Sequence, residues 1–333
     1  STAFFLAVGG AAAQPGTGAG IEPIAAASLA AAPTARPYDD RDWLQRFYAP
    51  RAYAPAWSEG TAKLALALLQ GAEAHGLSAA EYGAAALRNQ LDSAGPGDPR
   101  FDAALTRAML HYLADLRVGR VKSEFHTALP DPRLHSFDPV EQLRAALDGD
   151  GLAAAVAAAE PALPFYARVK DALAHYRELA AAPSQALPPA KKVQAGERYA
   201  AAAHLRERLV LLGDIAPGAA PAGDGIYTPE LAQGVRHFQL RHGLDGDGVL
   251  GNQTIAALNV PLSERVRQLE LTLERLRWLP AFGPGRLIAV NLPAYRLWAL
   301  RLGGAGQQEA PLEMRVIVGE AVKTPTPLFI GQM

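Results

Sequence analysis

The stretch TPELAQGVRHFQLRHGLDGDGVLGNQT, residues 228–254, contains a helix start, a helical apolar pattern and a glycine-rich turn. Thr228 followed by Pro229 is typical of an N-cap and first helical position. Glycines at 243, 246 and 248 permit turn conformations with positive φ. We therefore expect helices at 199–212, 228–242 and 252–258, the last capped by Asn252, and a compact three-helix unit over residues 197–260.

The residues before this unit show helical spacing from 38 to about 182. Asp98-Pro99 predicts the start of a long helix, whose apolar residues recur every three or four positions until Gly119. Ser78-Ala79-Ala80-Glu81 has the form of a capping box and predicts another helix start. We expect an alanine-rich helical domain over 38–182. Segments rich in Pro, Gly and Ala predict linkers at 15–37 and 183–196.

The residues after the three-helix unit change period. Residues 261–280 carry one apolar stripe at helical spacing and predict a connecting helix. From about residue 286 the apolar residues alternate, which predicts strands at 287–290, 295–300 and 312–318, with a hairpin turn at 303–306. Residues 286–333 are fewer than half of the roughly 100 residues of a typical β-sandwich domain. The fold class expected is mainly α, followed by the first strands of a truncated β domain.

Composition excludes several classes of protein. The 333 residues are 50% hydrophobic and 20% charged, with a net charge of -1. That balance supports buried cores and argues against a nucleic-acid binder, which would carry a basic excess. The chain has no cysteine, so it holds no disulfide, iron–sulfur cluster, cysteine zinc site or thiol nucleophile.

The first residues indicate export. Residues 1–14 have a short apolar run followed by small residues, as in the tail of a secretory signal peptide. No stretch reaches about 18 consecutive strongly apolar residues, so we expect no transmembrane helix. The periplasm is the compartment expected for such a chain.

Short motifs select no cofactor or metal. Residues 246–251 match G-x-G-x-x-G, but they follow a predicted helix where a dinucleotide site needs a strand. Asp245 and Asp247 resemble the start of a calcium-binding loop, but the residues after them do not have the spacing of an EF-hand. The eight histidines form no H-E-x-x-H pair. A pair of glycosidase carboxylates need not be close in sequence, and nothing here selects one.

Three blocks together resemble a peptidoglycan-binding module: 226–231 (IYTPEL), 235–239 (VRHFQ), and 243–254 (GLDGDGVLGNQT). The flanks resemble a large periplasmic L,D-transpeptidase. They are 47–48 (FY), 53–57 (YAPAW), 75–77 (HGL), 116–120 (LRVGR), 273–280 (LERLRWLP), 290–295 (VNLPAY), 314–319 (MRVIVG) and 324–327 (TPTP). The resemblance covers about residues 38–333, as a scaffold domain, a binding module and the start of a catalytic domain.

The resemblance implies acyl transfer between peptidoglycan stem peptides by a cysteine thiolate, with backbone donors holding the oxyanion. The family signature of a histidine followed by S-H-G-C is not matched here, so no catalytic residue is assigned and the chain as given is predicted inactive. Two alternatives stay open: a wall-binding scaffold without enzymatic activity, and a wall hydrolase using an unrecognised carboxylate pair.

The expected partner is peptidoglycan, held in a shallow groove near the turn before the third helix of the module. The candidate binding residues are Gln239, Arg241, Asp247, Asn252 and Thr254. The Arg241 guanidinium is able to donate two hydrogen bonds to a stem-peptide carboxylate, and the amides of a helix N-terminus are able to bind the same group. The alternative is that these side chains only shape the turn, cap the helix or bond to the backbone.

Overall fold

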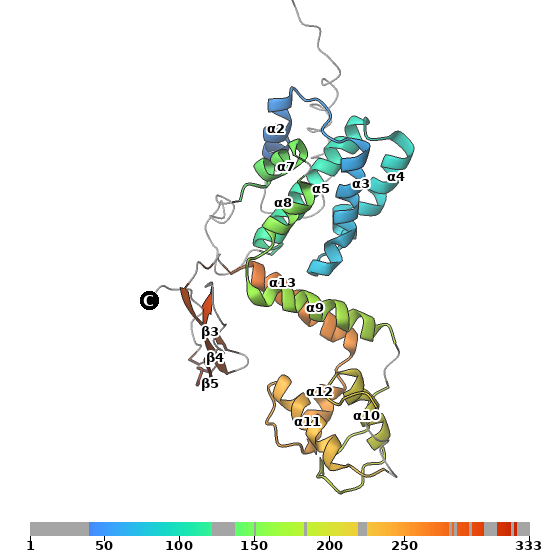
Figure 1. Ribbon diagram of the computed structural model, residues 1–333, viewed down its shortest axis with the longest axis vertical. Coiled ribbons are helices and arrows are strands. Elements are labelled where there is room, and N and C mark those ends of the chain that lie inside the picture. The colour runs from blue at the N-terminus through green and yellow to red at the C-terminus, as the bar shows by residue number, and fades with distance from the viewer. Residues whose placement is uncertain are drawn as a thin grey trace, which may run out of the picture. The chain divides into compact units, whose positions relative to one another are not determined.

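The computed structural model describes residues 40–121, 137–149, 151–182, 185–218, 225–279, 285–292, 295–302 and 312–320, with 282, 323 and 324. The expected signal-peptide remnant (1–14), the first linker (15–37) and the hairpin turn (303–306) lie outside the described residues. The described part is mainly α, with one small sheet near its C-terminal end (Figure 1). The expected fold class is therefore confirmed.

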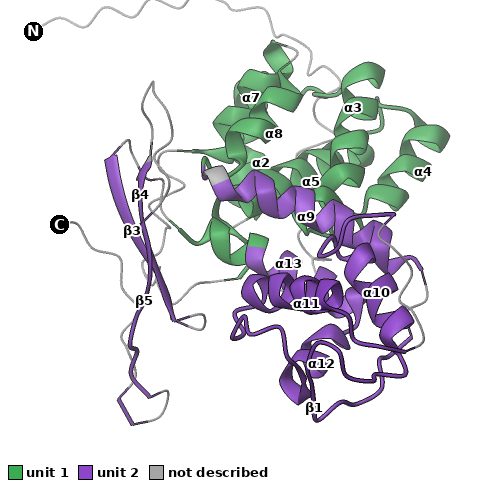
Figure 2. Cartoon of the chain, turned by 60° about the horizontal axis from the view of Figure 1, so that its bottom comes forward, with its two compact units in different colours: residues 1–162, 273–280 green, residues 163–272, 281–333 purple. Residues whose placement is uncertain are grey.

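The chain divides into two compact units, residues 1–162 with 273–280, and residues 163–272 with 281–333 (Figure 2). The first unit is therefore built from two separate parts of the sequence. Its boundary differs from the expected helical domain of 38–182, because residues 163–182 belong to the second unit.

Helix α5, Pro99–Val118, is the centre of the first unit, and 15 of its 20 residues are buried. The Asp98 side chain accepts a hydrogen bond from the Arg100 amide at 2.8 Å, and Pro99 occupies the first turn, as the sequence predicts. Gly119 ends the helix with a φ of +83°. A helix this buried needs partners on every side, which the surrounding helices supply.

The described part of the first unit also contains α2 (Asp40–Tyr48), η3 (Ala49–Arg51), α3 (Glu59–Gln70), η4 (Gly71–His75), η5 (Ala79–Tyr82), α4 (Ala84–Ala94), α7 (Pro139–Asp148) and α8 (Leu152–Ala159). The five α-helices of this set all contact α5. The capping box lies at Ser58 and Thr61, which start α3. The one expected at Ser78 is wrong, because Ser78 makes no side-chain cap bond and precedes only a 3-10 turn. Helix α8 was not predicted, since its run of alanines has no amphipathic pattern.

A buried carboxylate joins the N-terminal helices to α5. Asp102 is fully buried and accepts hydrogen bonds from the Tyr48 hydroxyl at 2.5 Å and from the Ala56 and Trp57 amides at 2.8 and 3.1 Å. Thr106, one turn further on, contacts the Tyr48 hydroxyl at 2.7 Å and accepts from the Trp57 indole at 2.9 Å. Tyr48 of the FY block and Trp57 of the YAPAW block therefore converge on one polar cluster in the core.

The second unit contains α9 (Pro164–Ala180), α10 (Ala202–Leu211), α11 (Pro229–Arg241), α12 (Asn252–Leu258) and most of α13 (Leu262–Arg277). Helices α10 to α12 share one apolar core around Phe238, Leu231 and Tyr227. The unexpected short strands β1 (Lys192–Val193) and β2 (Leu250–Gly251) pair antiparallel and tie the second linker to this module. The expected three helices of the module are all present.

The C-terminal sheet is an antiparallel meander of β3 (Gly285–Asn291), β4 (Arg296–Leu302) and β5 (Leu312–Arg315). Ile288 pairs with Ala299, and Ala299 with Leu312, so these residues share one face. That face is open to solvent in the described residues: Ile288 is 46% and Leu312 is 58% exposed. The alternation in the sequence predicted these strands, although β5 stops at Arg315, short of the expected residue 318.

Candidate functional site

Helix α11 carries a buried glutamine into the turn before α12. Thr228 accepts a hydrogen bond from the Leu231 amide at 3.3 Å and starts α11 as predicted. Near the other end of this helix, Gln239 is 2% exposed, and Phe238 beside it is in the module core. The helix therefore places one amide side chain inside the module.

The Gln239 amide holds the glycine-rich turn in place. Its Nε2 lies 2.9 Å from Asp247 Oδ1, 3.1 Å from the Val249 carbonyl and 3.1 Å from Thr254 Oγ1. Its Oε1 accepts the Gly248 amide at 2.8 Å. An amide has two N–H donors, so these three acceptors share them. One side chain thus links the turn to the first turn of α12.

The turn itself requires a glycine at 248. Its φ is +69°, and a Cβ there would lie 2.9 Å from the Ala232 carbonyl oxygen. The Tyr227 hydroxyl donates to the Gly248 carbonyl at 2.8 Å. The Val249 amide donates to Asp247 at 2.9 Å, and this hydrogen bond is the main cause that holds the pKa of Asp247 below its usual value. The turn is therefore closed by its own polar groups.

Arg241 is paired within the protein. Its Nε lies 2.9 Å from Asp214 Oδ1 and its guanidinium Nη2 lies 2.6 Å from Asp214 Oδ2. The Asp214 side chain is fully buried, and His237 Nδ1 also lies 2.7 Å from it. The hydrogen bonds that Arg241 donates to the Asp214 carboxylate raise the pKa of Arg241. The bidentate partner that the sequence suggested, a stem-peptide carboxylate, is here an internal aspartate.

The two remaining candidates lie on α12. Thr254 is 4% exposed and contacts Gln239. Asn252 is exposed, and the expectation that it caps α12 is wrong: Gly251 is the N-cap and no side chain caps this end. The predicted residues therefore divide into a structural knot (Gln239, Asp247 and Thr254), an internally paired arginine (Arg241) and an exposed amide (Asn252). Peptidoglycan contact by any of them stays a prediction.

Sequence reasoning missed Asp214 and its partner His237. Asp214 follows Gly213, whose φ is +77°, in the turn after α10. A buried aspartate in such a turn has no sequence signature, because its partners come from another helix. The spacing of His237 and Arg241, four residues apart on α11, places them on one face and is the only available signal.

A small pocket lies within the second unit, lined by residues of α9, α10, α11, α12 and α13. His242 stacks near Phe238 with ring centroids 4.1 Å apart, and its Nε2 is buried. Burial, with Arg265 and Arg241 nearby, lowers the pKa of His242 to about 4. Arg208 and Arg265 line the same pocket and donate to the Leu258 and Ala257 carbonyls at the end of α12. These arginines therefore act as helix C-caps.

The described residues contain no group of three or more His, Asp or Glu side chains placed to hold a metal ion. Among the same residues, no helix is both long enough and apolar enough to cross a membrane.

Comparison with known families places two of these regions. Residues 42–173 match the family model described as a scaffold domain. Residues 198–258 match the model described as a putative peptidoglycan binding domain, which spans α10, α11 and α12. No curated protein matches the chain. The two matches support a role in binding the cell wall and fit an L,D-transpeptidase-like architecture, and both end before β3.

Proposed function

We propose that this chain binds peptidoglycan in the periplasm through residues 198–258 and forms the part of an L,D-transpeptidase that precedes the catalytic centre. The observation that carries the proposal is the match of residues 198–258 to a peptidoglycan-binding domain, downstream of a scaffold-domain match. The meander β3–β5 follows both in the order that the sequence resemblance requires. The module has its own apolar core, as a binding unit needs.

The binding surface proposed is the exposed rim of the 243–251 turn. Buried Gln239 is bonded to exposed Asp247 in the turn and to buried Thr254 on α12, so it supports this rim from beneath. Asn252 is exposed on the α12 side, and Arg236 is exposed on the α11 side with its Nε donating to the Gly246 carbonyl at 2.6 Å. An amide and a guanidinium suit the carboxylates and amides of stem peptides.

Sedimentation with purified sacculi tests the binding part. Asn252→Ala and Arg236→Ala should each reduce the affinity about fivefold, the equivalent of roughly 1 kcal/mol for one polar contact. Asn252→Ala should leave the melting temperature unchanged, whereas Arg236→Ala should lower it slightly because the Gly246 carbonyl loses its donor. Asn89→Ala, an exposed amide on α4, is the matched control and should bind like the wild type. Wild-type binding by both module variants would place the contact elsewhere. Arg241→Ala is the less direct test, because it also frees buried Asp214.

The transferase part is tested outside the module. Sequencing the coding DNA past the codon for Met333 should find an open frame that reaches a histidine and then S-H-G-C. An immediate stop codon would contradict the proposal. The chain of 333 residues, which has no thiol, should form no carbapenem adduct by mass spectrometry and release no D-alanine from tetrapeptide muropeptides. The longer protein encoded by the open frame should form the carbapenem adduct and release D-alanine.

A further inference from the structure

The end of α13 is part of the first compact unit, although it follows the whole peptidoglycan-binding module in sequence. Residues 273–280 group with residues 1–162. Leu273 is fully buried, Glu274 is 4% exposed and Arg277 is 1% exposed. We call residues 273–279 the strap. Two oppositely charged side chains can be buried in this segment only if other polar groups are placed to bond with them.

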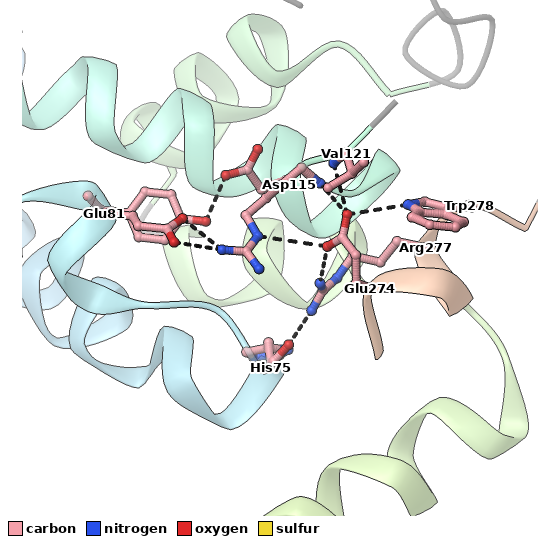
Figure 3. A network of polar contacts seen from close by, with 9 residues as sticks. His75, Glu81, Asp115, Val121, Glu274, Arg277 and Trp278 are labelled. Carbon is pink, nitrogen blue, oxygen red and sulfur yellow. Dashed lines mark hydrogen bonds and ion pairs between the residues drawn. The ribbon is translucent and has the colours of Figure 1, made fainter. Parts of the chain in front are cut away.

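The Glu274 carboxylate is the centre of those partners (Figure 3). Its Oε1 accepts the Arg120 amide at 2.6 Å, the Val121 amide at 3.0 Å and the Trp278 indole N–H at 3.3 Å. Its Oε2 accepts from Arg277 at 3.0 Å. One carboxylate therefore joins the backbone just after α5 to two side chains of the strap.

The backbone after α5 is shaped to receive this carboxylate. Gly119 has a φ of +83°, and a Cβ at this position would lie 2.7 Å from Glu274 Oε1 and 3.0 Å from the Trp278 indole nitrogen. The glycine that ends α5 thus also leaves the space in which the strap sits. Adding a methyl group there would force the strap and the 119–121 backbone apart.

Two arginines extend the contact to the rest of the unit. The Arg277 guanidinium donates to the His75 carbonyl at the end of η4. Arg120 donates to both carboxylate oxygens of Glu81 at 2.7 and 2.8 Å. Three sequence blocks that lie far apart, HGL at 75–77, LRVGR at 116–120 and LERLRWLP at 273–280, therefore meet in one network.

We infer that the surface formed by His75, Gly119, Arg120 and Val121 is a docking site for the strap, and that Glu274 is the positioning residue that holds it. The occupant is a segment of this same chain, identified by its buried contacts. The inference rests on those contacts and not on the proposed function.

The strap has a consequence for the strands. Six residue steps separate Leu279 from Gly285, the first residue of β3, and an extended chain spans at most about 3.6 Å per residue, or roughly 22 Å. A docked strap therefore limits how far the start of the sheet can move from the helical unit. When Glu274 is removed, that limit is relaxed.

Hydrogen exchange on the full chain tests the docking site. Glu274→Gln removes the charge beside buried Arg277 and should raise exchange in peptides containing 75–77, 116–121 and 273–279 by about tenfold or more, because losing one partner of a buried ion pair is strongly destabilising. Exchange in 198–258 should not change. Glu270→Gln is the matched control, one turn earlier on α13, where Glu270 pairs with Arg177 at the partly exposed surface. Equal exchange in both variants would overturn the inference.

A second variant separates docking from general loss of structure. Glu274→Gln combined with Arg277→Met removes both charges, and it should recover part of the protection lost in Glu274→Gln alone, although the His75 carbonyl loses its Arg277 donor. If exchange instead rises further in the double variant, the pair is not what holds the strap.

Distances between two spin labels test whether the docked strap restrains the start of the sheet. The chain has no cysteine, so Asn89→Cys on α4 and Arg301→Cys on β4, both exposed, accept spin labels without background. Glu274→Gln should broaden the distance distribution between the two labels, and the Arg277→Met double variant should narrow it again. An unchanged distribution in Glu274→Gln, with exchange raised, would show that the strap does not restrain the sheet and would overturn that part of the inference.

Discussion

Replacing Gln239 by glutamate tests whether the turn before α12 depends on a neutral amide. Gln239 Nε2 faces three acceptors, one of which is the Asp247 carboxylate at 2.9 Å. Glutamate has nearly the same shape but no N–H donor. Gln239→Glu therefore converts three attractive contacts into oxygen–oxygen contacts, one of them between two carboxylates. The Gly248 amide can still donate to the remaining oxygen.

The size of the effect follows from these contacts. Two lost donor contacts cost about 1 kcal/mol each. The repulsion between the introduced glutamate and the Asp247 carboxylate is limited, because one of the two can stay protonated. Keeping a proton at pH 7 on a glutamate with an ordinary pKa near 4.3 costs about 3.7 kcal/mol, which is the upper limit of the repulsion. Asp247 is already stabilised in its charged form by the Val249 amide, so the introduced glutamate takes the proton. The proton and the two lost donor contacts together set an upper limit of about 5–6 kcal/mol on the loss of local stability at pH 7, and the loss falls to about 2 kcal/mol at pH 4.5, where holding the proton costs little.

Hydrogen exchange read by mass spectrometry is the suitable assay, since the chain has more than one unit and no tryptophan reports on the module. Peptides covering α11 and the 243–258 region should lose protection at pH 7 and regain much of it at pH 4.5, after correction for intrinsic exchange. Gln233→Glu, the same change at an exposed position of α11, is the control and should have little effect. A loss of protection that is the same at both pH values would refute the role assigned to the carboxylate pair.

Three further predictions concern other buried groups. Acidification from pH 7 to 4 should destabilise the module by about 1–2 kcal/mol after allowance for partial solvent screening. The reason is that the pKa of His242 is about 4 in the folded chain and 6.5 in the unfolded chain, so between these values only the unfolded chain binds the proton. Hydrogen exchange in His242→Gln should depend less steeply on pH, and an equally steep dependence would count against the prediction. Asp214→Asn should cost about 2–3 kcal/mol by leaving Arg241 without its counter-charge, measured as faster exchange in α11, and no change would contradict the pairing. Tyr48→Phe should lower the stability of the helical unit by about 1–3 kcal/mol in thermal unfolding, because buried Asp102, whose pKa is already raised by burial, loses a donor; a wild-type midpoint would be evidence against this contact.

Local patterns in the sequence determined most of the helices and strands. The Asp98-Pro99 start and the Gly119 stop of α5, the Thr228 cap of α11 and the alternation in β3 and β4 each depend on a few neighbouring residues. Such signals act over one or two turns or along one strand, so they can be read without a tertiary structure. The Ser78 capping box failed because the same four-residue form also fits a 3-10 turn.

The roles of the polar side chains were decided by the tertiary structure alone. The sequence selected five side chains as one group: Gln239, Arg241, Asp247, Asn252 and Thr254. In the folded turn Gln239 is bonded to Asp247 and to Thr254, whereas Arg241 pairs with Asp214. Arg241 found Asp214, and Glu274 found the backbone at 120–121, across long stretches of sequence. A polar residue can be satisfied by any complementary group that packing brings near, and sequence spacing does not encode that choice. The sequence by itself thus determined most of the helices and strands and their order, whereas packing determined which charges are paired and where the strap docks.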